Sequence, residues 1–294
     1  MVAIRESVPV SGACLYVCST PIGNLQDVTL RLLEVLRMVD VVAAEDTRHT
    51  RKLLTHFDIH PARLVSYHEH NRSQRSADLV RWWQEGKSIA LVSDAGTPVL
   101  SDPGEDAVRL AIEQGVTVIP IPGPSALLAA LVASGLPAQP FTFVGFLPKS
   151  AKQSQSLLQR LAGMPGSLVI YEAPHRLQAT LRLLSDQLPV RSAVLAKELT
   201  KLHETFVSGN WDELLTWAQG SGVRGEFVIV IGPPAESQDA DGAEAEAERR
   251  LQAAVQLVAE AVQSGRSHRE AVQSAVEQTG ARRKDVYQAT LNRS

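Results

Sequence analysis

The sequence contains little cysteine and no long hydrophobic run. Cys14 and Cys18 are the two cysteines among 294 residues, which is too few for a disulfide framework and leaves a zinc site short of ligands. The longest apolar runs, such as residues 127–132, fall far short of the roughly 20 residues that span a bilayer, and no basic segment leads into an apolar one near residue 1. We therefore expect a cytoplasmic protein without a membrane segment, whose two thiols lie reduced in its core.

The common phosphate-binding motifs are also missing. No G-x-G-x-x-G follows a predicted strand, and no G-x-x-x-x-G-K-[ST] occurs in the chain, so a dinucleotide or a nucleoside triphosphate is not the expected ligand. Metal ligands are sparse as well. His68 and His70 flank Glu69, but no third ligand follows at a standard spacing, and we expect no metal.

The charged residues are unevenly distributed, although the formal net charge is only −3. Residues 47–75 contain six basic residues, two acidic residues and five of the eight histidines, and residues 249–294 contain eight basic and four acidic residues. Residues 236–248 hold six acidic residues and no basic one. Such runs are often only solvated surface, but two basic segments also suit a polyanionic partner, and the acidic run is typical of a flexible linker.

Strand and helix patterns alternate along most of the chain, which predicts an α/β fold. Residues 1–123 are expected to form a domain around a parallel sheet, and residues 124–233 a second α/β domain with a mixed sheet, because two of its strands follow each other directly. We expect an acidic linker over residues 234–246 and a small helical appendage over residues 247–294. The appendage would suit either RNA or a partner subunit.

Two loops rich in Gly and Pro should meet at the carboxyl edge of the first sheet. One is Ser93-Asp94-Ala95-Gly96-Thr97-Pro98, the other Pro122-Gly123-Pro124-Ser125, and between them a helix is predicted with Asp102 as its N-cap. Both loops could be ordinary strand-to-helix connections. However, such sheet edges bind small molecules, and Asp94 would repel a phosphate and attract a cation. The pattern therefore points to a sulfonium such as S-adenosylmethionine.

Polar residues also follow other predicted strands. Glu45 and Asp46 end a strand at the same edge, although Asp46 could simply cap the next helix. The donor-rich residues 67–71, followed by two arginines, suit phosphate contacts in RNA. Lys197 and Glu198 alternate across a strand, so only one of them can face a given cleft.

Nine motifs occur in order between Cys14 and Ile231: PIGNLQDVTLRLLEVL, AEDTRHTRKLL, SYHEHN, SDAGTPVLSDPG, PIPGPSALLAALVASGLP, FTFVGFLP, YEAPHRL, KELTKLHE and GEFVIVIG. Together they resemble the tetrapyrrole methylase superfamily, and most closely its branch of bacterial small-subunit ribosomal RNA methyltransferases. The resemblance implies two α/β domains with a cofactor cleft between them, plus a helical C-terminal appendage. It also implies S-adenosylmethionine-dependent methylation of a cytidine ribose 2′-hydroxyl in the decoding region of 16S ribosomal RNA.

Individual residues take roles from this resemblance. The cofactor would contact Asp94, Ala95, Gly96, Thr97, Pro122, Gly123, Ser125, Leu147 and Phe227. The RNA would contact Arg48, Arg51, His70, Arg72 and Arg176. From the chemistry of the transfer, either a base, Glu198, Asp46 or Glu45, could accept the hydroxyl proton, or a cation, Lys197 or Lys201, could stabilise the developing oxyanion. The family also implies a homodimer, with 16S ribosomal RNA within the small ribosomal subunit as its partner.

Two other functions fit part of the sequence. A tetrapyrrole C-methyltransferase of the same fold would use the same cofactor loops, but it would need neither the basic, histidine-rich residues 47–75 nor the helical appendage. A non-catalytic RNA-binding module for ribosome assembly would use the basic segments and hold the cofactor without transfer. Loss of methylation without loss of RNA affinity on changing Asp94 would distinguish an enzyme from such a module.

Overall fold

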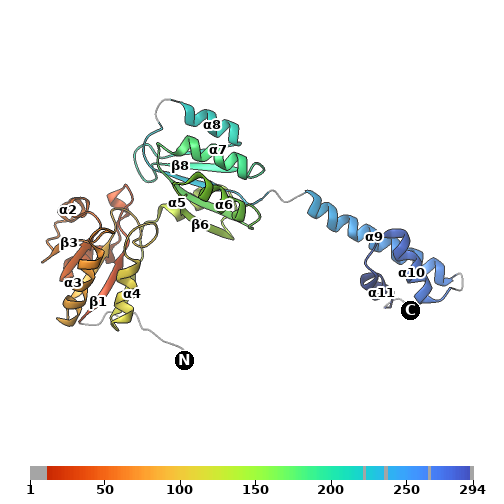
Figure 1. Cartoon of the computed structure of the whole chain (residues 1–294), viewed down its shortest axis with the longest axis horizontal. Coiled ribbons are helices and arrows are strands. Elements are labelled where there is room, and N and C mark those ends of the chain that lie inside the picture. The colour runs from red at the N-terminus through yellow and green to blue at the C-terminus, as the bar shows by residue number, and fades with distance from the viewer. Residues whose placement is uncertain (1–11, 221–222, 235–237, 264–265, 292–294) are drawn as a thin grey trace. The chain divides into compact units, whose positions relative to one another are not determined.

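The computed structural model describes residues 12–220, 223–234, 238–263 and 266–291. The chain divides into two compact units, Met1–Pro233 and Pro234–Ser294, whose elements are labelled in Figure 1. Parts of all four predicted segments lie outside the described residues: 1–11 of the N-terminal domain, 221–222 of the second α/β domain, 235–237 of the linker, and 264–265 and 292–294 of the appendage. In the described ranges, no helix combines the length and the apolar composition needed to cross a membrane.

The first sheet is entirely parallel, as predicted. Its strand order is β3-β2-β4-β1-β5, and every neighbouring pair runs in the same direction. The strands are short apolar runs, which is typical of strands covered on both faces. They are β1 (Cys14–Cys18), β2 (Val41–Ala44), β3 (Leu64–Ser66), β4 (Ser88–Val92) and β5 (Thr117–Ile121).

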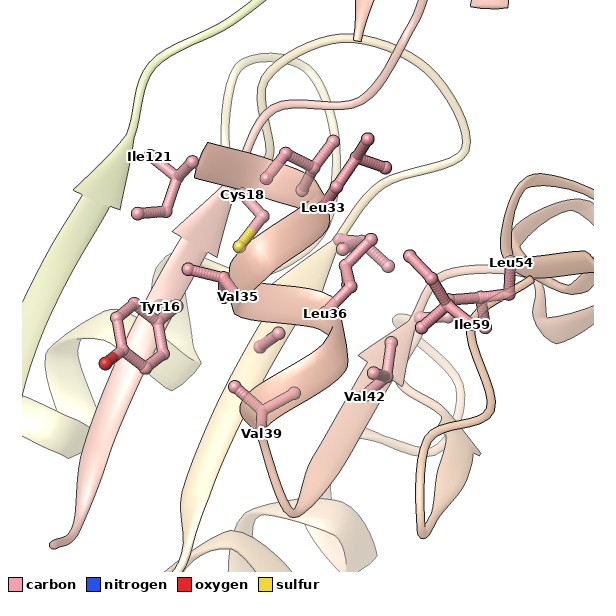
Figure 2. Close-up of a cluster of buried hydrophobic side chains, with 14 of the residues drawn as sticks. Tyr16, Cys18, Leu33, Val35, Leu36, Val39, Val42, Leu54, Ile59 and Ile121 are labelled. Carbon is pink, nitrogen blue, oxygen red and sulfur yellow. The ribbon is translucent and has the colours of Figure 1, made fainter. Parts of the chain in front are cut away.

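Helices bury both faces of this sheet. The 3-10 helix η1 (Leu25–Asp27) leads into α1, and the α-helices are α1 (Leu30–Met38), α2 (Thr47–His56), α3 (Arg72–Gln84) and α4 (Glu105–Glu113). Side chains of α1 and α2 form one core with the sheet, and side chains of α3 and α4 form the other. Figure 2 shows Val35 and Leu36 of α1 over Cys18 and Val42 of the sheet. Both predicted core thiols, Cys14 and Cys18, are buried, and burial raises the pKa of each.

The second sheet is mixed, as predicted. Its order is β6-β7-β10-β8-β9; β6 and β7 are parallel, and the other neighbours are antiparallel. Its strands are β6 (Phe141–Phe146), β7 (Ser167–Glu172), β8 (Ala193–Lys197), β9 (Thr205–Gly209) and β10 (Phe227–Ile231). One face carries α5 (Ala126–Ala133); the other carries α6 (Ala151–Leu161), α7 (Leu177–Gln187) and α8 (Trp211–Gln219).

A buried guanidinium ties the elements of the second sheet together. Arg191 is 3% exposed, and it donates hydrogen bonds to five carbonyl oxygens, those of Leu161, Ala162, Met164, Gly166 and Gly232. These carbonyls belong to the end of α6 and to the chain beside β7 and β10. No carboxylate among the described residues forms an ion pair with Arg191, so carbonyl dipoles alone solvate its charge.

The described residues of the second unit form three helices around a small apolar core. They are α9 (Gln238–Gln263), α10 (His268–Thr279) and α11 (Arg283–Leu291), and the core includes Ala254, Val258, Val272 and Val286. A helical C-terminal part is therefore present, as the fold class required. The helix α9 begins at Gln238, inside the segment where we expected a linker. The run of Ala and Glu there favours helix, and the prediction of a linker had rested on its negative charge alone.

Candidate active site

A cavity of about 390 Å³ lies where the loops that follow β2 and β4 meet the second sheet. The first sheet contributes Glu45 and much of the segment 94–102, and the second contributes residues of β7 and β10. The loops leave β2 and β4 at their carboxyl ends, which is where parallel sheets bind ligands. The structure therefore has the cleft between two α/β domains that the fold class predicted.

The structure brings most of the predicted cofactor residues to this cavity. Six of them line it: Asp94, Ala95, Gly96, Thr97, Ser125 and Phe227. Gly123 lines a neighbouring cavity of about 310 Å³, which it shares with Ser125. Leu147 is 2% exposed in the core of the second sheet. Pro122 belongs to the same connection as Gly123, directly after β5, and lines neither of these cavities.

Backbone pairing holds the 94–97 loop against the turn that follows β1. Thr20 and Gly96 exchange two backbone hydrogen bonds, with N···O distances of 2.8 and 3.0 Å. The hydroxyls of Ser19 and Thr97 lie 2.9 Å apart. Gly96 has φ +81, a left-handed conformation that favours glycine. The loop is thus fixed before any ligand arrives.

The cavity is acidic. Five carboxylates line it, those of Glu45, Asp94, Asp102, Glu172 and Glu226, and no Lys, Arg or His is among its described lining residues. Phe146, Tyr171 and Phe227 supply aromatic surface. A cationic ligand with an apolar or aromatic body suits such a lining, because carboxylates attract it and ring faces favour a cation.

Asp102 corrects one prediction. We expected it to cap α4, but the helix begins at Glu105, its N-cap residue is Gly104, and no side chain caps it. Gly104 has φ +132, so the backbone turns sharply there and Asp102 is left outside the helix, at the cavity. Burial, and then the charges of Glu45 and Asp94, raise the pKa of Asp102 to about 7. Capping statistics missed this residue because the glycine two positions later sets the helix start.

Glu45, Asp46 and Asp94 form one hydrogen-bonded group. The Asp94 carboxylate accepts from the Asp46 N–H at 3.0 Å, and the Asp94 N–H donates to the Glu45 carboxylate at 3.2 Å. Asp46 caps α2, as we had considered, by accepting from the Arg48 N–H at 2.8 Å. Hydrogen bonds from Arg48 lower the pKa of Asp46, while burial raises the pKa of Glu45.

His49 completes this group. Its Nδ1 lies 3.1 Å from the Asp94 carboxylate, and ligand atoms of Asp46, His49 and Asp94 lie within 4.8 Å of one another. The carboxylates already have partners in Arg48 and in backbone N–H groups. We assign no metal to these residues.

The other predicted catalytic residues are held away from the cavity lining. Lys201 Nζ lies 2.8 Å from the Glu198 carboxylate and 3.1 Å from that of Glu226. Lys201 lowers the pKa of Glu198, which does not suit a base. Of the five predicted catalytic residues, Glu45 lines the cavity, whereas Asp46, Lys197, Glu198 and Lys201 do not.

The predicted RNA-contacting residues fall into two groups. Arg48 and Arg51 lie on α2 and line a shallow depression together with Lys52, Thr55 and His56. His70 and Arg72 are exposed at the start of α3. Arg176 is engaged inside the protein, because it donates to the Leu147 carbonyl at 3.0 Å and its Nε lies 3.5 Å from the Glu172 carboxylate.

Two aromatic residues at the cavity were not predicted. The Tyr171 hydroxyl accepts a hydrogen bond from the Leu127 N–H at 3.0 Å, and its ring lies edge-on to Phe143 and Phe146. Burial raises the pKa of Tyr171. Both Phe146 and Tyr171 stand in motifs that we had noted, FTFVGFLP and YEAPHRL, but only pairing of β6 with β7 brings the two rings together.

Comparisons with known proteins agree with this architecture. The family model of Tetrapyrrole (Corrin/Porphyrin) Methylases matches residues 14–215. The ribosomal RNA small subunit methyltransferases I of Halalkalibacterium halodurans and Bacillus subtilis are 42% and 40% identical to the chain, over 93% and 94% of its length and 93% of each relative. That of Synechocystis is 50% identical over 74% of the chain and 78% of its own length.

Solved structures resemble the fold at lower identity. A uroporphyrin-III C-methyltransferase from Thermus thermophilus, complexed with S-adenosylhomocysteine, has a TM-score of 0.54 at 19% identity and covers 74% of this chain and 97% of its own. A cobalt precorrin-4 methyltransferase has a TM-score of 0.57 at 17% identity, over 74% and 94% of the two chains. The chain therefore belongs to the tetrapyrrole methylase family and, within it, to the ribosomal RNA small subunit methyltransferase I group.

Proposed function

We propose that this protein methylates the ribose 2′-hydroxyl of a cytidine in the decoding region of 16S ribosomal RNA. It is an S-adenosylmethionine-dependent ribosomal RNA methyltransferase, in keeping with its relatives. We further propose that it acts in the cytoplasm as a homodimer, with the small ribosomal subunit as its substrate. The nucleotide and the 2′-oxygen follow from the family resemblance.

The acidic cavity is the single observation that carries the cofactor assignment. S-adenosylmethionine, when bound, supplies a methyl group on a positively charged sulfur. Three of the carboxylates, those of Glu45, Asp94 and Asp102, form no ion pair with a Lys or Arg among the described residues, and no cationic side chain is among the described lining residues, which gives that charge a favourable setting. The residues present therefore fit this cofactor, and Asp94 together with the adjoining loop would hold it.

The protein's part in the reaction is to bind, align and accept a proton. The loop after β4 and the cavity between the two sheets would hold the methyl donor in one position. Alignment of a methyl donor with its acceptor supplies much of the rate enhancement in a methyl transfer. Exposed cations on α2 and at the start of α3 would hold phosphates of the RNA beside the cavity.

The rival functions have less support. A tetrapyrrole C-methyltransferase would share the fold, as the solved structures do, but relatives at 40–50% identity are named for ribosomal RNA. A non-catalytic module would hold the cofactor without transfer, whereas the relatives are named methyltransferases.

The decisive experiment measures transfer of labelled methyl groups from S-adenosylmethionine. Small ribosomal subunits and naked 16S RNA, both from a strain that lacks the modification, are compared as acceptors, and nuclease mapping locates the product. A single labelled 2′-O-methylcytidine in the decoding region would support the proposal, and the ratio of the two acceptors would identify the substrate. Cofactor binding without any labelled RNA would contradict it, and a labelled tetrapyrrole would favour the first rival.

A further inference from the structure

The five cavity carboxylates differ in how firmly they are engaged. The side chain of Glu172 is fully buried, accepts hydrogen bonds from the Ala173 N–H and the Thr180 hydroxyl, and forms an ion pair with Arg176. Glu226 is 78% exposed in its side chain and pairs with Lys201. Neither is free to take up a proton at the cavity, because one is saturated with donors and the other is neutralised in solvent.

Two of the remaining carboxylates hold the site together. Asp94 accepts from the Asp46 N–H and contacts His49, and Glu45 accepts from the Asp94 N–H. Protonation of either would weaken a hydrogen bond that fixes the loop. Asp102 is the carboxylate that no such framework bond occupies. Among its described neighbours, only the Ser93 hydroxyl favours its charged form, whereas Glu45 and Asp94 oppose it.

The backbone holds Asp102 in place from both sheets. Val99 and Ser101 have φ values of +79 and +68, which are strained for residues with a side chain. A Cβ on Gly104 would lie 2.7 Å from Leu91 of the first sheet, and one on Gly145 of the second sheet would lie 3.0 Å from the Ser101 hydroxyl. The segment thus packs tightly against β4 on one side and β6 on the other, which fixes the backbone that carries Asp102 at the cavity.

We propose that Asp102 is the proton acceptor of the cavity, ionised beside the methyl donor and protonated when the acceptor hydroxyl is methylated. This inference rests on the proposed function and assigns a role that the sequence had given to Glu198, Asp46 or Glu45. The groups that face Asp102 are Glu45 and Asp94 from the first sheet, the Ser93 hydroxyl, and Tyr171 from the second sheet.

In the proposed step, the ribose hydroxyl loses its proton and gains the methyl group. The O–H bond of the ribose hydroxyl breaks, its proton goes to a carboxylate oxygen of Asp102, and its electron pair stays on the ribose oxygen. That oxygen bonds the methyl carbon, and the electron pair of the breaking C–S bond returns to sulfur. The negative charge of Asp102 and the positive charge of the donor therefore disappear together, and the proton leaves to water before the next turnover. A base that titrates near neutral pH suits such a transfer.

This pairing of charges predicts that the affinity for S-adenosylmethionine depends on pH, and this dependence can be measured without RNA. The Kd values of S-adenosylmethionine and S-adenosylhomocysteine are measured by calorimetry from pH 5.5 to 8.5, on wild type, D102N and the control E105Q. Glu105 is exposed on α4 and lies outside the cavity lining. Both ligands carry the same amino acid and adenosine, so the ratio of their Kd values isolates the sulfonium.

In wild type and E105Q, the preference for S-adenosylmethionine should grow about tenfold as the pH rises through 7, because the cation favours the ionised carboxylate. In D102N the ratio should stay constant with pH. A ratio that keeps the wild-type pH dependence in D102N would overturn the assignment of the charge to Asp102.

Single-turnover methylation of the RNA tests the proton step itself. D102N should lower the rate about 100-fold or more, with the Kd of S-adenosylhomocysteine unchanged within about threefold, and D102E should recover part of the rate. A D102N enzyme that keeps the wild-type rate and pH profile would overturn the proton-acceptor role. A wild-type protein that does not methylate RNA would instead overturn the proposed function, and with it the acceptor, while the binding ratio would still decide whether Asp102 carries the charge.

Discussion

The Asp94 carboxylate accepts a hydrogen bond from the Asp46 N–H at 3.0 Å and so joins the loop after β4 to the start of α2. Asp94 therefore combines two tasks, because the same carboxylate lines the cofactor cavity. One oxygen fixes the loop, and the negative charge acts on whatever the cavity holds. Two substitutions separate these tasks.

The variant D94N keeps an oxygen that can accept from the Asp46 N–H but loses the charge. We expect its affinity for S-adenosylmethionine to fall about tenfold, with little change for S-adenosylhomocysteine. D94A loses the hydrogen bond as well, and its free energy of unfolding should fall by about 1 kcal/mol more. Calorimetry and denaturant unfolding measure the two effects, and E34Q on the exposed face of α1 is the control. Equal loss of both ligands in D94N would show that its charge does not act on the sulfonium.

Asp102 should make the free protein less stable as the pH rises. Burial raises the pKa of its carboxyl to about 7 in the folded state, above the ordinary value of 3.8 that it has in the unfolded chain. Between these values the folded state holds a proton that the unfolded state has released, so the free energy of unfolding falls with rising pH. D102N should remove this slope and be more stable than wild type at pH 8 by about 1–2 kcal/mol, a value discounted for partial solvent screening.

Denaturant unfolding at pH 5 and pH 8, without ligand, measures this difference. Wild type and D102N should be closest in stability at pH 5, where the side chain is neutral in both folded proteins. A D102N variant that is destabilised equally at both pH values would show that Asp102 is simply needed for packing.

Arg191 should be essential for the stability of the second sheet. R191M removes the guanidinium donor from five carbonyl oxygens, three of them in buried and two in half-buried bonds, and should lower the free energy of unfolding by about 3–5 kcal/mol. R191K restores some of the bonds and should recover part of the loss. R182M, on the exposed side of α7, should change stability by less than about 0.5 kcal/mol. A loss below 1 kcal/mol in R191M would mean that water replaces the guanidinium.

The exposed cations of α2 should contribute to RNA affinity without affecting the cofactor. R51A should weaken RNA binding and reduce the slope of log K against log salt by about 0.7, the value for one phosphate contact with a single strand. Filter binding over a range of salt concentrations measures this slope, with R109A on α4 as the matched control. An unchanged slope in R51A would exclude Arg51 from the RNA contact.

The sequence was informative where a repeated pattern decides the structure. Alternating strands and helices predicted a parallel sheet followed by a mixed one, and both are confirmed. The same reasoning failed for single residues whose position depends on a neighbour's backbone. Asp102 followed by Glu105 fits a capping box, but the conformation of Gly104 moves the helix start past it.

Contacts between strands that are distant in the sequence could not be predicted from local sequence patterns either. Glu198 is a carboxylate at the end of a strand, where a catalytic base would be expected. In the structure, however, its carboxylate accepts a hydrogen bond from the Glu226 N–H at 3.0 Å and pairs with Lys201. That arrangement follows from the pairing of β8 with β10, which no local pattern specifies. The acidic character of the cavity could be seen only once five carboxylates from both sheets had been brought together.

The chain passes from the first sheet to the second once in the described residues, through residues 122–125. Pro122 and Pro124 have a ring-locked φ, and the next helix is bonded to the second sheet by the Leu127 N–H on Tyr171. The Thr97 hydroxyl also donates to the Pro124 carbonyl at 3.4 Å. A stiff connection of this kind makes a poor hinge. We therefore expect ligand exchange through the mouth of the cavity, without a hinge motion of the two sheets about this segment.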